Sequence, residues 1–469
     1  MVLLFLLCLV GACFGGEPSC SDTSLVVSVY KNGASLASAV LTLERGSHCL
    51  SRAAFEAQVS LAACGDAASC EARDGAGRVV TSCEELETLA LEKGVQPEGS
   101  IRVYGVERDK RFIFASEYVG FARYLPQLKV TLVTLSLEPR LFGVEGFLTE
   151  QLADEVIKDA LAIDDDEHRF MLSSTGPKGY SPSSSRTSEN AWLKFGPAAT
   201  KLKRSAFTLL GMDFYDEEMA DGLQVLRYDI AKAYVAHTDY LSRPADLTAE
   251  QMDPKKGGSN RLATLFLYLS DVDEGGQTVF PLIDRPKIED VKVKEYLETK
   301  NTDDIDWRNL SIEKNSWEDK MIYDCYSKLA VRPKKGRAIL YYSQKPPGEL
   351  DPLSKHGGCP VLSGTKWAAN LWIWNKKMPF GSSRFPANAD NNAKNNAIPI
   401  SIDYQGHRTD IGLYWQGTTK IGDNLRPKEA MRLSSYLGHS FVAKNEHGRI
   451  FASFTIEQGK TIYLIDDDA

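Results

Sequence analysis

Five short segments rich in β-branched and aromatic residues lie between Leu223 and Asn375, separated by polar stretches that contain Gly or Pro. Runs this short, bounded by turn residues, are typical of strands in an all-β sandwich or barrel. Helical patterns precede them, with Thr149 as the N-cap of a helix that ends near Leu161 and a second helix over 197–210. The chain is therefore predicted to be α+β, with a jelly-roll core and flanking helices. The predicted strands are LQVLRYD, YVAHTDYL, RLATLFLYLSD, GRAILYYSQ and KWAANLWIWN.

The remainder of the chain is predicted to form further domains, because 469 residues are too many for one hydrophobic core. Residues 17–110 combine short alternating runs with a helix near Ala53–Ala62, which predicts a small α+β domain that fits a β-grasp arrangement. Residues 377–397 are rich in Asn, Ala, Gly, Ser and Pro and are predicted to be a linker. Residues 398–469 alternate apolar and polar positions, which predicts a C-terminal β-sandwich.

Two polar insertions interrupt the strand region, at Ser242–Asn260 and Val291–Lys320. Both are longer than the usual connections of a compact domain. Loops of this kind often carry function, so the insertions are predicted to be mobile or to cover the substrate.

The beginning of the chain predicts a secretory destination. Met1–Gly16 is almost wholly apolar, but it is shorter than the roughly 20 residues that a helix needs to cross a bilayer. We interpret it as a signal peptide cleaved near Gly15 or Gly16, although the usual positive charge at its start is missing. The expected location is the endoplasmic-reticulum lumen or the outside of the cell, with no transmembrane segment after cleavage.

The cysteines fit such a compartment. An oxidising environment favours local disulfides, and Cys325 with Cys359 is the natural pair in the later part of the chain. The odd total leaves one thiol over, and the lack of a CxxC motif gives little support to a zinc or thioredoxin-type site. The cysteines after the signal segment are Cys20, Cys49, Cys64, Cys70, Cys83, Cys325 and Cys359.

Overall charge bears on the class of partner. The formal net charge is −8 and no Lys- or Arg-rich stripe runs along the chain. Proteins that bind nucleic acid need such positive surfaces, so a nucleic-acid partner is not expected.

A metal site is predicted from three residues. His237 and Asp239 lie two positions apart in a strand pattern and so on one face, and His356 follows much later beside a pair of glycines. Two imidazoles and one carboxylate can fill three facial positions of an octahedral Fe(II) and leave the others open for a keto acid and O₂. Thiolates, which would favour zinc, are not part of the set.

Lys366 completes the predicted site. It lies ten residues after His356, across a turn rich in glycine, and a hairpin or near-hairpin of that length would return it beside the metal. Its ammonium could pair with the far carboxylate of 2-oxoglutarate in a charge-assisted contact. A lysine supplies a point charge there, whereas an arginine would offer a two-pronged fork.

The region from Leu137 to about Asn375 resembles the prolyl 4-hydroxylase catalytic domain of collagen-modifying and plant or algal cell-wall enzymes. The matching motifs occur in the right order over about half of the chain. They include EGGQTVFP at 274–281 and HGGCPV at 356–361, with YVAHTD at 234–239, YLSD at 268–271 and KW at 366–367. The resemblance implies a double-stranded β-helix catalytic domain over 137–376.

The resemblance also implies roles for individual residues. Fe(II) would be bound by His237, Asp239 and His356, and the 2-oxoglutarate carboxylate by Lys366. Positions that line the co-substrate pocket in this family match Tyr228 and Tyr268, whereas Asn370 and Trp372 belong either to the same wall or to packing of the barrel. The residues that match peptide-contacting positions are Arg186 and Tyr234.

The implied activity is that of a procollagen-proline 4-dioxygenase. Fe(II), O₂ and 2-oxoglutarate would hydroxylate C4 of a peptidyl proline and release succinate and CO₂, with ascorbate as a further cofactor. The substrate would be a proline-rich or collagen-like peptide bound as a polyproline-II strand. Two alternatives stay open: a peptide-binding protein with an inactive dioxygenase fold, and a dioxygenase that acts on another residue such as lysine. The oligomeric state is not predicted.

The C-terminal segment resembles the β-domain of the von Hippel–Lindau protein, which reads hydroxyproline. The resemblance rests on YWQG at 414–417 and RLSSYLGH at 432–439. It implies that Ser435 and His439 contact hydroxyproline, and it places Phe441 where that protein has a tryptophan. The alternative is a β-sandwich with a structural role only.

Overall fold

The computed structural model describes the chain in segments. The segment 1–16, predicted to be a signal peptide, lies outside the described residues, as does most of the predicted linker. The described residues are 24–44, 51–66, 69–81, 85–86, 101–164, 168–173, 186–194, 196–212, 214–241, 248–379, 398–415, 419–435, 440–457, 460 and 462–466.

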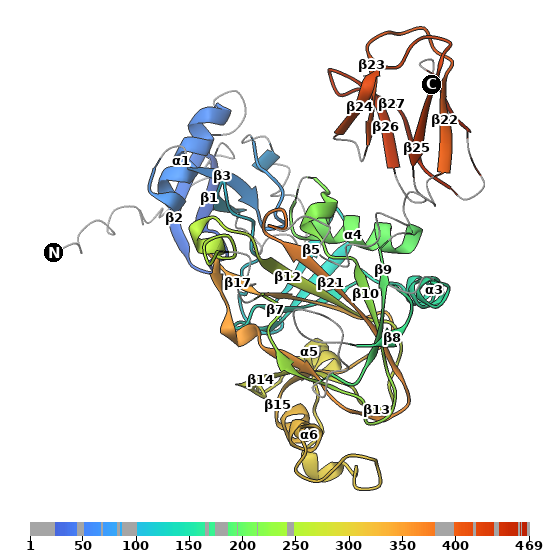
Figure 1. Cartoon of the computed structure of the whole chain (residues 1–469). Coiled ribbons are helices and arrows are strands. Elements are labelled where there is room, and N and C mark those ends of the chain that lie inside the picture. Colours follow the sequence, from blue (N-terminus) through green and yellow to red (C-terminus); the bar gives the residue numbers. More distant parts are fainter. Residues whose placement is uncertain are drawn as a thin grey trace, which may run out of the picture.

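Two antiparallel sheets form the central region of the molecule (Figure 1). The larger has the strand order β5-β6-β7-β16-β12-β21-β10-β9-β8 and the smaller the order β11-β19-β14-β15. The strands of the larger sheet, in that order, are Ala122–Leu125, Val130–Ser136, Leu141–Glu145, Ala338–Tyr342, Arg261–Tyr268, Lys366–Trp374, Leu223–Tyr228, Glu189–Leu193 and Met171–Leu172. Those of the smaller sheet are Tyr234–His237, His356–Gly358, Thr278–Asp284 and Lys328–Val331. Short strand pairs at the edges are β13 (Glu274–Gly275) with β20 (Val361–Ser363), and β17 (Gln344–Lys345) with β18 (Glu349–Leu350).

The alternating side chains of β21 show what each face of the larger sheet packs against. Ala368 packs in a cluster that contains Phe280 and Val331 of the smaller sheet, so this face lies between the sheets. Leu371 and Ile373 pack in the other cluster, together with the buried sides of the helices. Because successive side chains of a strand point to opposite faces, Lys366, Asn370 and Trp372 share the face of Ala368.

Helices α3 (Glu150–Leu161) and α4 (Pro197–Leu209) cover the outer face of the larger sheet. The Thr149 hydroxyl accepts a hydrogen bond from the backbone N–H of Leu152 at 3.1 Å, which caps α3 as predicted. Pro197 occupies the first turn of α4, where its missing N–H costs nothing. The α+β class and the bounds of both predicted helices are confirmed to within one residue.

The prediction that Val291–Lys320 is a loop is wrong in part. Helix α5 (Val291–Tyr296) lies at its beginning, and α6 (Trp317–Ser327) starts within it. Asp290 and Ser316 accept hydrogen bonds from backbone N–H groups of the first turns, so each helix has a side-chain cap. The four short 3₁₀ turns of the described chain are Glu217–Met219, Pro254–Lys256, Thr302–Asp304 and Pro352–Ser354.

The predicted disulfide between Cys325 and Cys359 is confirmed. It joins α6 to the segment that directly follows β19, and a second disulfide joins Cys64 to Cys70 near the beginning of the chain. No helix among the described residues is long and apolar enough to cross a membrane.

A mixed sheet with the order β2-β1-β4-β3 forms the N-terminal region, and helix α1 packs on it. The region contacts segments that lead into the central sheets: the guanidinium of Arg140, in the turn before β7, donates to the Gly33 carbonyl at 3.0 Å, and the Ile113 N–H, between β4 and β5, donates to Asn32 at 2.9 Å. The elements are β1 (Ser24–Lys31), β2 (Ala37–Glu44), α1 (Arg52–Cys64), β3 (Cys70–Asp74) and β4 (Ile101–Glu107).

Seven strands form two further sheets at the C-terminal end, drawn in orange to red in Figure 1. Their orders are β25-β22-β28 and β24-β23-β26-β27, and they enclose a hydrophobic cluster that includes Ile402, Leu413 and Phe441. The strands are β22 (Ile398–Tyr404), β23 (Ile411–Trp415), β24 (Thr419–Asn424), β25 (Ala430–Ser435), β26 (Ser440–Asn445), β27 (Ile450–Thr455) and β28 (Ile462–Ile465).

Candidate metal centre and co-substrate pocket

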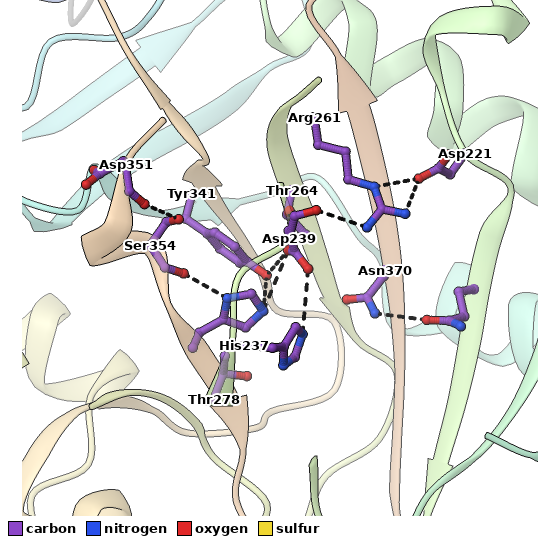
Figure 2. A network of polar contacts seen from close by, with 12 residues as sticks. Asp221, His237, Asp239, Arg261, Thr264, Thr278, Tyr341, Asp351, Ser354 and Asn370 are labelled. Atoms are coloured by element: carbon purple, nitrogen blue, oxygen red, sulfur yellow. Dashed lines mark hydrogen bonds and ion pairs between the residues drawn. The ribbon is translucent and has the colours of Figure 1, made fainter. Parts of the chain in front are cut away.

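Three predicted ligands converge between the two sheets. Potential ligand atoms of His237, Asp239 and His356 all lie within 4.8 Å of one another. His237 ends β11 and His356 begins β19, and the two residues are direct partners in the antiparallel register. Figure 2 shows the His237 ring pointing toward the Asp239 carboxylate, and Nε2 of His356 lies 3.6 Å from Oδ2 of the same carboxylate. The prediction that Asp239 lies inside the strand is wrong, because β11 ends at His237 and the chain bends after it.

Hydrogen bonds to the backbone fix the orientation of both imidazoles. Nδ1 of His237 lies 2.9 Å from the carbonyl oxygen of Val235, and Nδ1 of His356 lies 2.9 Å from that of Ser354. A carbonyl oxygen can only accept, so Nδ1 carries the proton in each ring. Nε2 of each ring therefore keeps its lone pair on the side that faces Asp239, as a metal ligand requires, and in His356 this nitrogen also lies 2.9 Å from the Tyr341 hydroxyl.

The Asp239 carboxylate is held by two hydroxyls that the sequence did not mark as functional. Thr264 donates to Oδ2 at 2.6 Å and Tyr341 donates to the same oxygen at 2.9 Å. The only signal for Thr264 is its polarity within the otherwise apolar run LATLFLY of β12. Nothing in the sequence distinguishes Tyr341 from its neighbour Tyr342.

Arg261 supports Asp239 through its backbone. One guanidinium nitrogen donates to the Asp239 carbonyl at 3.2 Å, while the others bind the Asp221 carboxylate at 2.7 and 2.8 Å. Burial raises the pKa of Asp221, and Arg261 acts against this. The pair fixes the bend that follows β11, which explains how Asp239 reaches the site from outside the strand.

The protonation states suit a divalent metal. Burial, together with the neighbouring His356, lowers the pKa of His237 to about 3. Burial would raise the pKa of Asp239, but the His356 and His237 rings outweigh it and the pKa of this carboxyl falls below its ordinary value. A neutral imidazole and an ionised carboxylate are thus ready as ligands at neutral pH. Two imidazole nitrogens with one carboxylate suit Fe(II).

Lys366 is a buried cation in an aromatic surrounding. Its ammonium lies 5.3, 5.2 and 5.6 Å from the ring centres of Tyr228, Phe266 and Tyr268. Among the residues that the structure describes, none forms a hydrogen bond or an ion pair with it, and burial lowers the pKa of Lys366 to about 7. A buried lysine without an anion calls for an anionic ligand, and the far carboxylate of 2-oxoglutarate fits this need.

The connection between His356 and Lys366 differs from the predicted hairpin. β19 belongs to the smaller sheet and β21 to the larger one, and the short strand β20 lies between them and pairs with β13. The chain therefore crosses from one sheet to the other. Lys366 reaches the space between the sheets because it faces the same way as Ala368 on β21.

The other predicted pocket residues lie on this same inner face. Tyr228 is the direct partner of Lys366, and the Tyr268 hydroxyl donates to Thr278 at 2.7 Å. Asn370 donates to Gln224 at 3.3 Å. The inner face thus carries both tyrosines beside the ammonium and places Asn370 further along the strand.

Trp372 lies beyond Asn370 and is partnered with Thr264 in the register of the sheet. The Arg261 guanidinium stacks over its ring at 3.9 Å. The indole Nε1 is buried, and no residue in the described part of the chain forms a hydrogen bond with it.

Arg186 and Tyr234, predicted to contact a peptide, do lie together at the metal centre. The Arg186 guanidinium lies 4.6 Å from the Tyr234 ring centre, and that ring stacks on His237 at 3.9 Å. Arg186 also donates to Gln224 at 3.2 Å, the same oxygen that Asn370 uses. The stack therefore forms one wall beside the ligand His237.

The two residues predicted to contact hydroxyproline are not tested by the structure. Ser435 is the last residue of β25, where its backbone pairs with Ile398. His439 lies outside the described residues.

Comparisons with known proteins agree with this geometry. Residues 223–374 match the family model of the 2OG-Fe(II) oxygenase superfamily. Prolyl 4-hydroxylase 2 of Arabidopsis thaliana is 32% identical over 249 residues, which cover 51% of this chain and 68% of the relative. Probable prolyl 4-hydroxylase 8 of the same plant is 33% identical over 246 residues, which cover 52% and 71%.

Solved structures of prolyl hydroxylases are also similar to this chain. Viral collagen prolyl hydroxylase from Paramecium Bursaria Chlorella virus-1, in complex with 2-oxoglutarate, is 23% identical with a TM-score of 0.31, over 50% of this chain and 96% of that one. A Pseudomonas putida prolyl-4-hydroxylase is 14% identical with a TM-score of 0.27, over 50% and 92%. On the sequence identity to the Arabidopsis enzymes, the chain belongs to the prolyl 4-hydroxylase family of 2-oxoglutarate- and Fe(II)-dependent oxygenases.

Proposed function

We propose that the protein hydroxylates peptidyl proline at C4, using Fe(II), 2-oxoglutarate and O₂. The observation that carries the proposal is the convergence of His237, Asp239 and His356 in the same inter-sheet space that contains the ammonium of Lys366, for which the described residues offer no ion-pair partner. One group of residues fits the metal and the other fits the anionic co-substrate. The double-stranded β-helix catalytic domain over 137–376 is part of this proposal.

The chain contributes positioning and charge. His237, Asp239 and His356 would hold Fe(II), and Lys366 would hold the far carboxylate of 2-oxoglutarate with Tyr228 and Tyr268 around it. When bound, the metal and the keto acid supply the oxidation of a C–H bond by O₂. The protein's residues keep the reacting groups in place, and the burial of Asp239, His356 and Lys366 limits the access of water.

The substrate is proposed to be a proline-rich or collagen-like peptide. The Arg186–Tyr234 stack lies directly on His237 and offers an aromatic and cationic wall beside the metal. Asn370 and Trp372 extend the pocket along β21. A polyproline-II strand loses little entropy on binding to an aromatic surface of this kind.

A secretory location is also proposed. The disulfides Cys325–Cys359 and Cys64–Cys70 support it, since such bonds persist in oxidising compartments. The segment 1–16 would serve as the signal peptide. The resemblance to the family implies that ascorbate would support turnover. The N-terminal domain at 17–110, the linker at 377–397 and the C-terminal domain at 398–469 stay predictions.

A turnover assay with product analysis tests the main proposal. Purified protein with Fe(II), 2-oxoglutarate and proline-rich peptides is expected to release succinate and to add one oxygen to proline, located by fragment mass spectrometry. Oxygen on lysine would favour the alternative specificity. Metal binding without any peptide-dependent succinate across collagen-like, cell-wall-like and poly-proline peptides would favour an inactive peptide-binding protein.

The proposed hydroxyproline contact of the C-terminal domain needs a separate test. Metal-free protein is compared with its Ser435→Ala/His439→Ala variant for binding of hydroxylated and plain proline peptides. Preference for the hydroxylated peptide that the variant loses would support the contact. Equal binding by both proteins leaves the domain with a structural role.

A further inference from the structure

Tyr341 stands at the metal centre without being one of the three ligands. It lies on β16 directly opposite Thr264 of β12, and its side chain is fully buried. Its ring packs edge-on against Phe280 at 5.5 Å and lies 4.7 Å from the His356 ring. These contacts fix the hydroxyl at the end of the ring, and Figure 2 shows it directed at Asp239.

The two carboxylate oxygens of Asp239 are distinguished by hydrogen bonds and not by distance to the imidazoles. Oδ1 lies 3.7 Å from Nε2 of His237, and Oδ2 lies 3.6 Å from Nε2 of His356. Both the Thr264 and the Tyr341 hydroxyls, however, donate to Oδ2, at 2.6 and 2.9 Å. Within the described part of the chain, no group donates a hydrogen bond to Oδ1.

Two donors use up the capacity of Oδ2. A carboxylate has about four lone-pair positions, which is about two for each oxygen. When Tyr341 gives its single proton to Oδ2, both positions of Oδ2 are engaged and those of Oδ1 are free. Oδ1 is the oxygen that can bind a metal.

We propose that Tyr341 is a positioning residue that, together with Thr264, restricts Asp239 to metal binding through Oδ1 alone. The inference rests on the proposed function, since it concerns the same iron site. If Oδ2 also bound the metal, it would occupy one of the positions that 2-oxoglutarate and O₂ need. Tyr341 thereby keeps that position open for the co-substrate.

The single proton of the hydroxyl strengthens this role once a metal is bound. The Tyr341 oxygen lies 2.9 Å from Oδ2 of Asp239 and also 2.9 Å from Nε2 of His356. Nδ1 of His356 already carries the ring proton, so Nε2 is an acceptor in the metal-free protein. When the Nε2 lone pair binds a metal, the hydroxyl has Oδ2 as its remaining acceptor.

The test separates co-substrate affinity from metal affinity. Tyr341→Phe removes the hydroxyl and keeps the ring. Tyr342→Phe is a matched control, because Tyr342 is the next residue of β16, is equally buried, and accepts a hydrogen bond from the Phe114 N–H on the opposite face of the sheet. Mn(II) affinity is measured without co-substrate, and 2-oxoglutarate affinity is measured on the Mn(II)-loaded protein without O₂.

Tyr341→Phe is expected to weaken 2-oxoglutarate binding by about tenfold or more, because the freed Oδ2 would compete for a metal position that the keto acid needs. Mn(II) affinity is expected to change by less than about threefold, because the added Oδ2 ligand offsets the loss of the hydrogen bond behind Asp239. The d–d absorption of the Co(II)-loaded variant is expected to differ from that of the wild type as the coordination of Asp239 changes. Tyr342→Phe is expected to match the wild type in all three measurements.

Thr264→Val provides the second variant, since it removes the other donor to Oδ2 at nearly constant volume. It is also expected to weaken 2-oxoglutarate binding while Mn(II) affinity stays nearly unchanged. If Tyr341→Phe does not fold, Thr264→Val alone tests the inference. Unchanged 2-oxoglutarate affinity, or a parallel loss of metal and co-substrate affinity, would overturn the inference while the proposed function stands. Failure of the wild-type protein itself to bind Mn(II) would overturn the proposed function.

Discussion

His237 and His356 are direct partners on the antiparallel strands β11 and β19, with ring centres 4.6 Å apart. A strand register that slipped by one residue would turn one imidazole to the opposite face of the sheet. The spacing of the two imidazole ligands is therefore determined by backbone pairing. Asp239, which lies beyond the strand, depends instead on side-chain contacts with Thr264 and Tyr341.

Removal of a ligand should abolish metal binding. His356→Ala and Asp239→Ala are each expected to weaken Mn(II) binding by more than about 100-fold, because even residues behind the ligands commonly contribute 10- to 100-fold. Calorimetric titration with Mn(II) measures this. The control is His447→Ala, since His447 is exposed in the C-terminal region. Metal affinity retained in His356→Ala would show that the centre has been assigned to the wrong residues.

Binding of 2-oxoglutarate should depend on pH through Lys366. Its pKa is about 7 in the free protein, so the ammonium that attracts the carboxylate is lost as the pH rises above this value. Between about pH 7 and 9 the dissociation constant should rise by roughly tenfold per pH unit, because one proton must be taken up on binding. Calorimetry in buffers of different ionisation enthalpy detects that proton. Lys366→Met should bind weakly and without this slope.

The same lysine should make the co-substrate-free protein more stable as the pH rises, although the rise in pH weakens 2-oxoglutarate binding. Its pKa is lowered from an ordinary value of 10.5, so the unfolded chain binds more protons than the folded one between about pH 7 and that value. The free energy of unfolding should therefore rise with pH in this window. The destabilisation that comes from burying the charged lysine should reach its full size below pH 7. Urea unfolding of wild type and Lys366→Met at pH 7 and 9 measures the difference. A wild type that is less stable at pH 9, relative to the variant, would contradict the buried, unpaired state of Lys366.

The two glycines after His356 should differ in their tolerance of a methyl group. A Cβ at Gly357 would lie 2.6 Å from Met321 Cε and, more seriously, 3.0 and 3.1 Å from the backbone of Tyr234 and Ala236 in β11. A Cβ at Gly358 would meet its nearest atoms at 3.7 Å, an ordinary contact. Gly357→Ala should cost about 1–3 kcal/mol of stability and weaken metal binding, because β11 carries His237. Gly358→Ala should fold like the wild type, and equal effects on unfolding midpoints would refute the explanation.

Loss of the Cys325–Cys359 disulfide should destabilise the centre. The bond closes a loop with a sequence separation of 34, for which chain entropy gives about 3–4 kcal/mol. Cys325→Ala/Cys359→Ala should unfold at lower urea and bind metal more weakly, since Cys359 follows shortly after His356. The comparison is Cys64→Ala/Cys70→Ala, which opens a loop with a separation of only 6 near the N-terminus. Its metal affinity should not change.

Features that depend on local sequence were predicted well. The cap at Thr149 and the apolar period fixed the bounds of α3, and the HxD spacing with His356 identified the ligand set. The inserted helices were missed because residues 291–320 are mostly polar, and the buried side chains of α6 such as Met321 and Tyr326 lie beyond that segment.

Features that depend on contacts between strands could not be predicted. Tyr341 reaches Asp239 because β16 and β12 place it opposite Thr264, and one sequence contains no information on that register. The bend that holds Asp239 likewise depends on Arg261, which lies on another strand. The crossing of the chain between the sheets was mistaken for a hairpin, since a three-residue strand such as β20 gives almost no periodic signal.

That crossing has a consequence for the choice of keto acid. The metal ligands belong to one sheet or to the bend after its strand, while the ammonium of Lys366 is attached to the facing sheet. Packed sheets keep a separation of about 10 Å whatever the length of the loop that joins them. The packing of the two sheets therefore sets the distance between the metal ligands and Lys366. That distance determines how many methylene groups the dicarboxylate can have between its two acid ends.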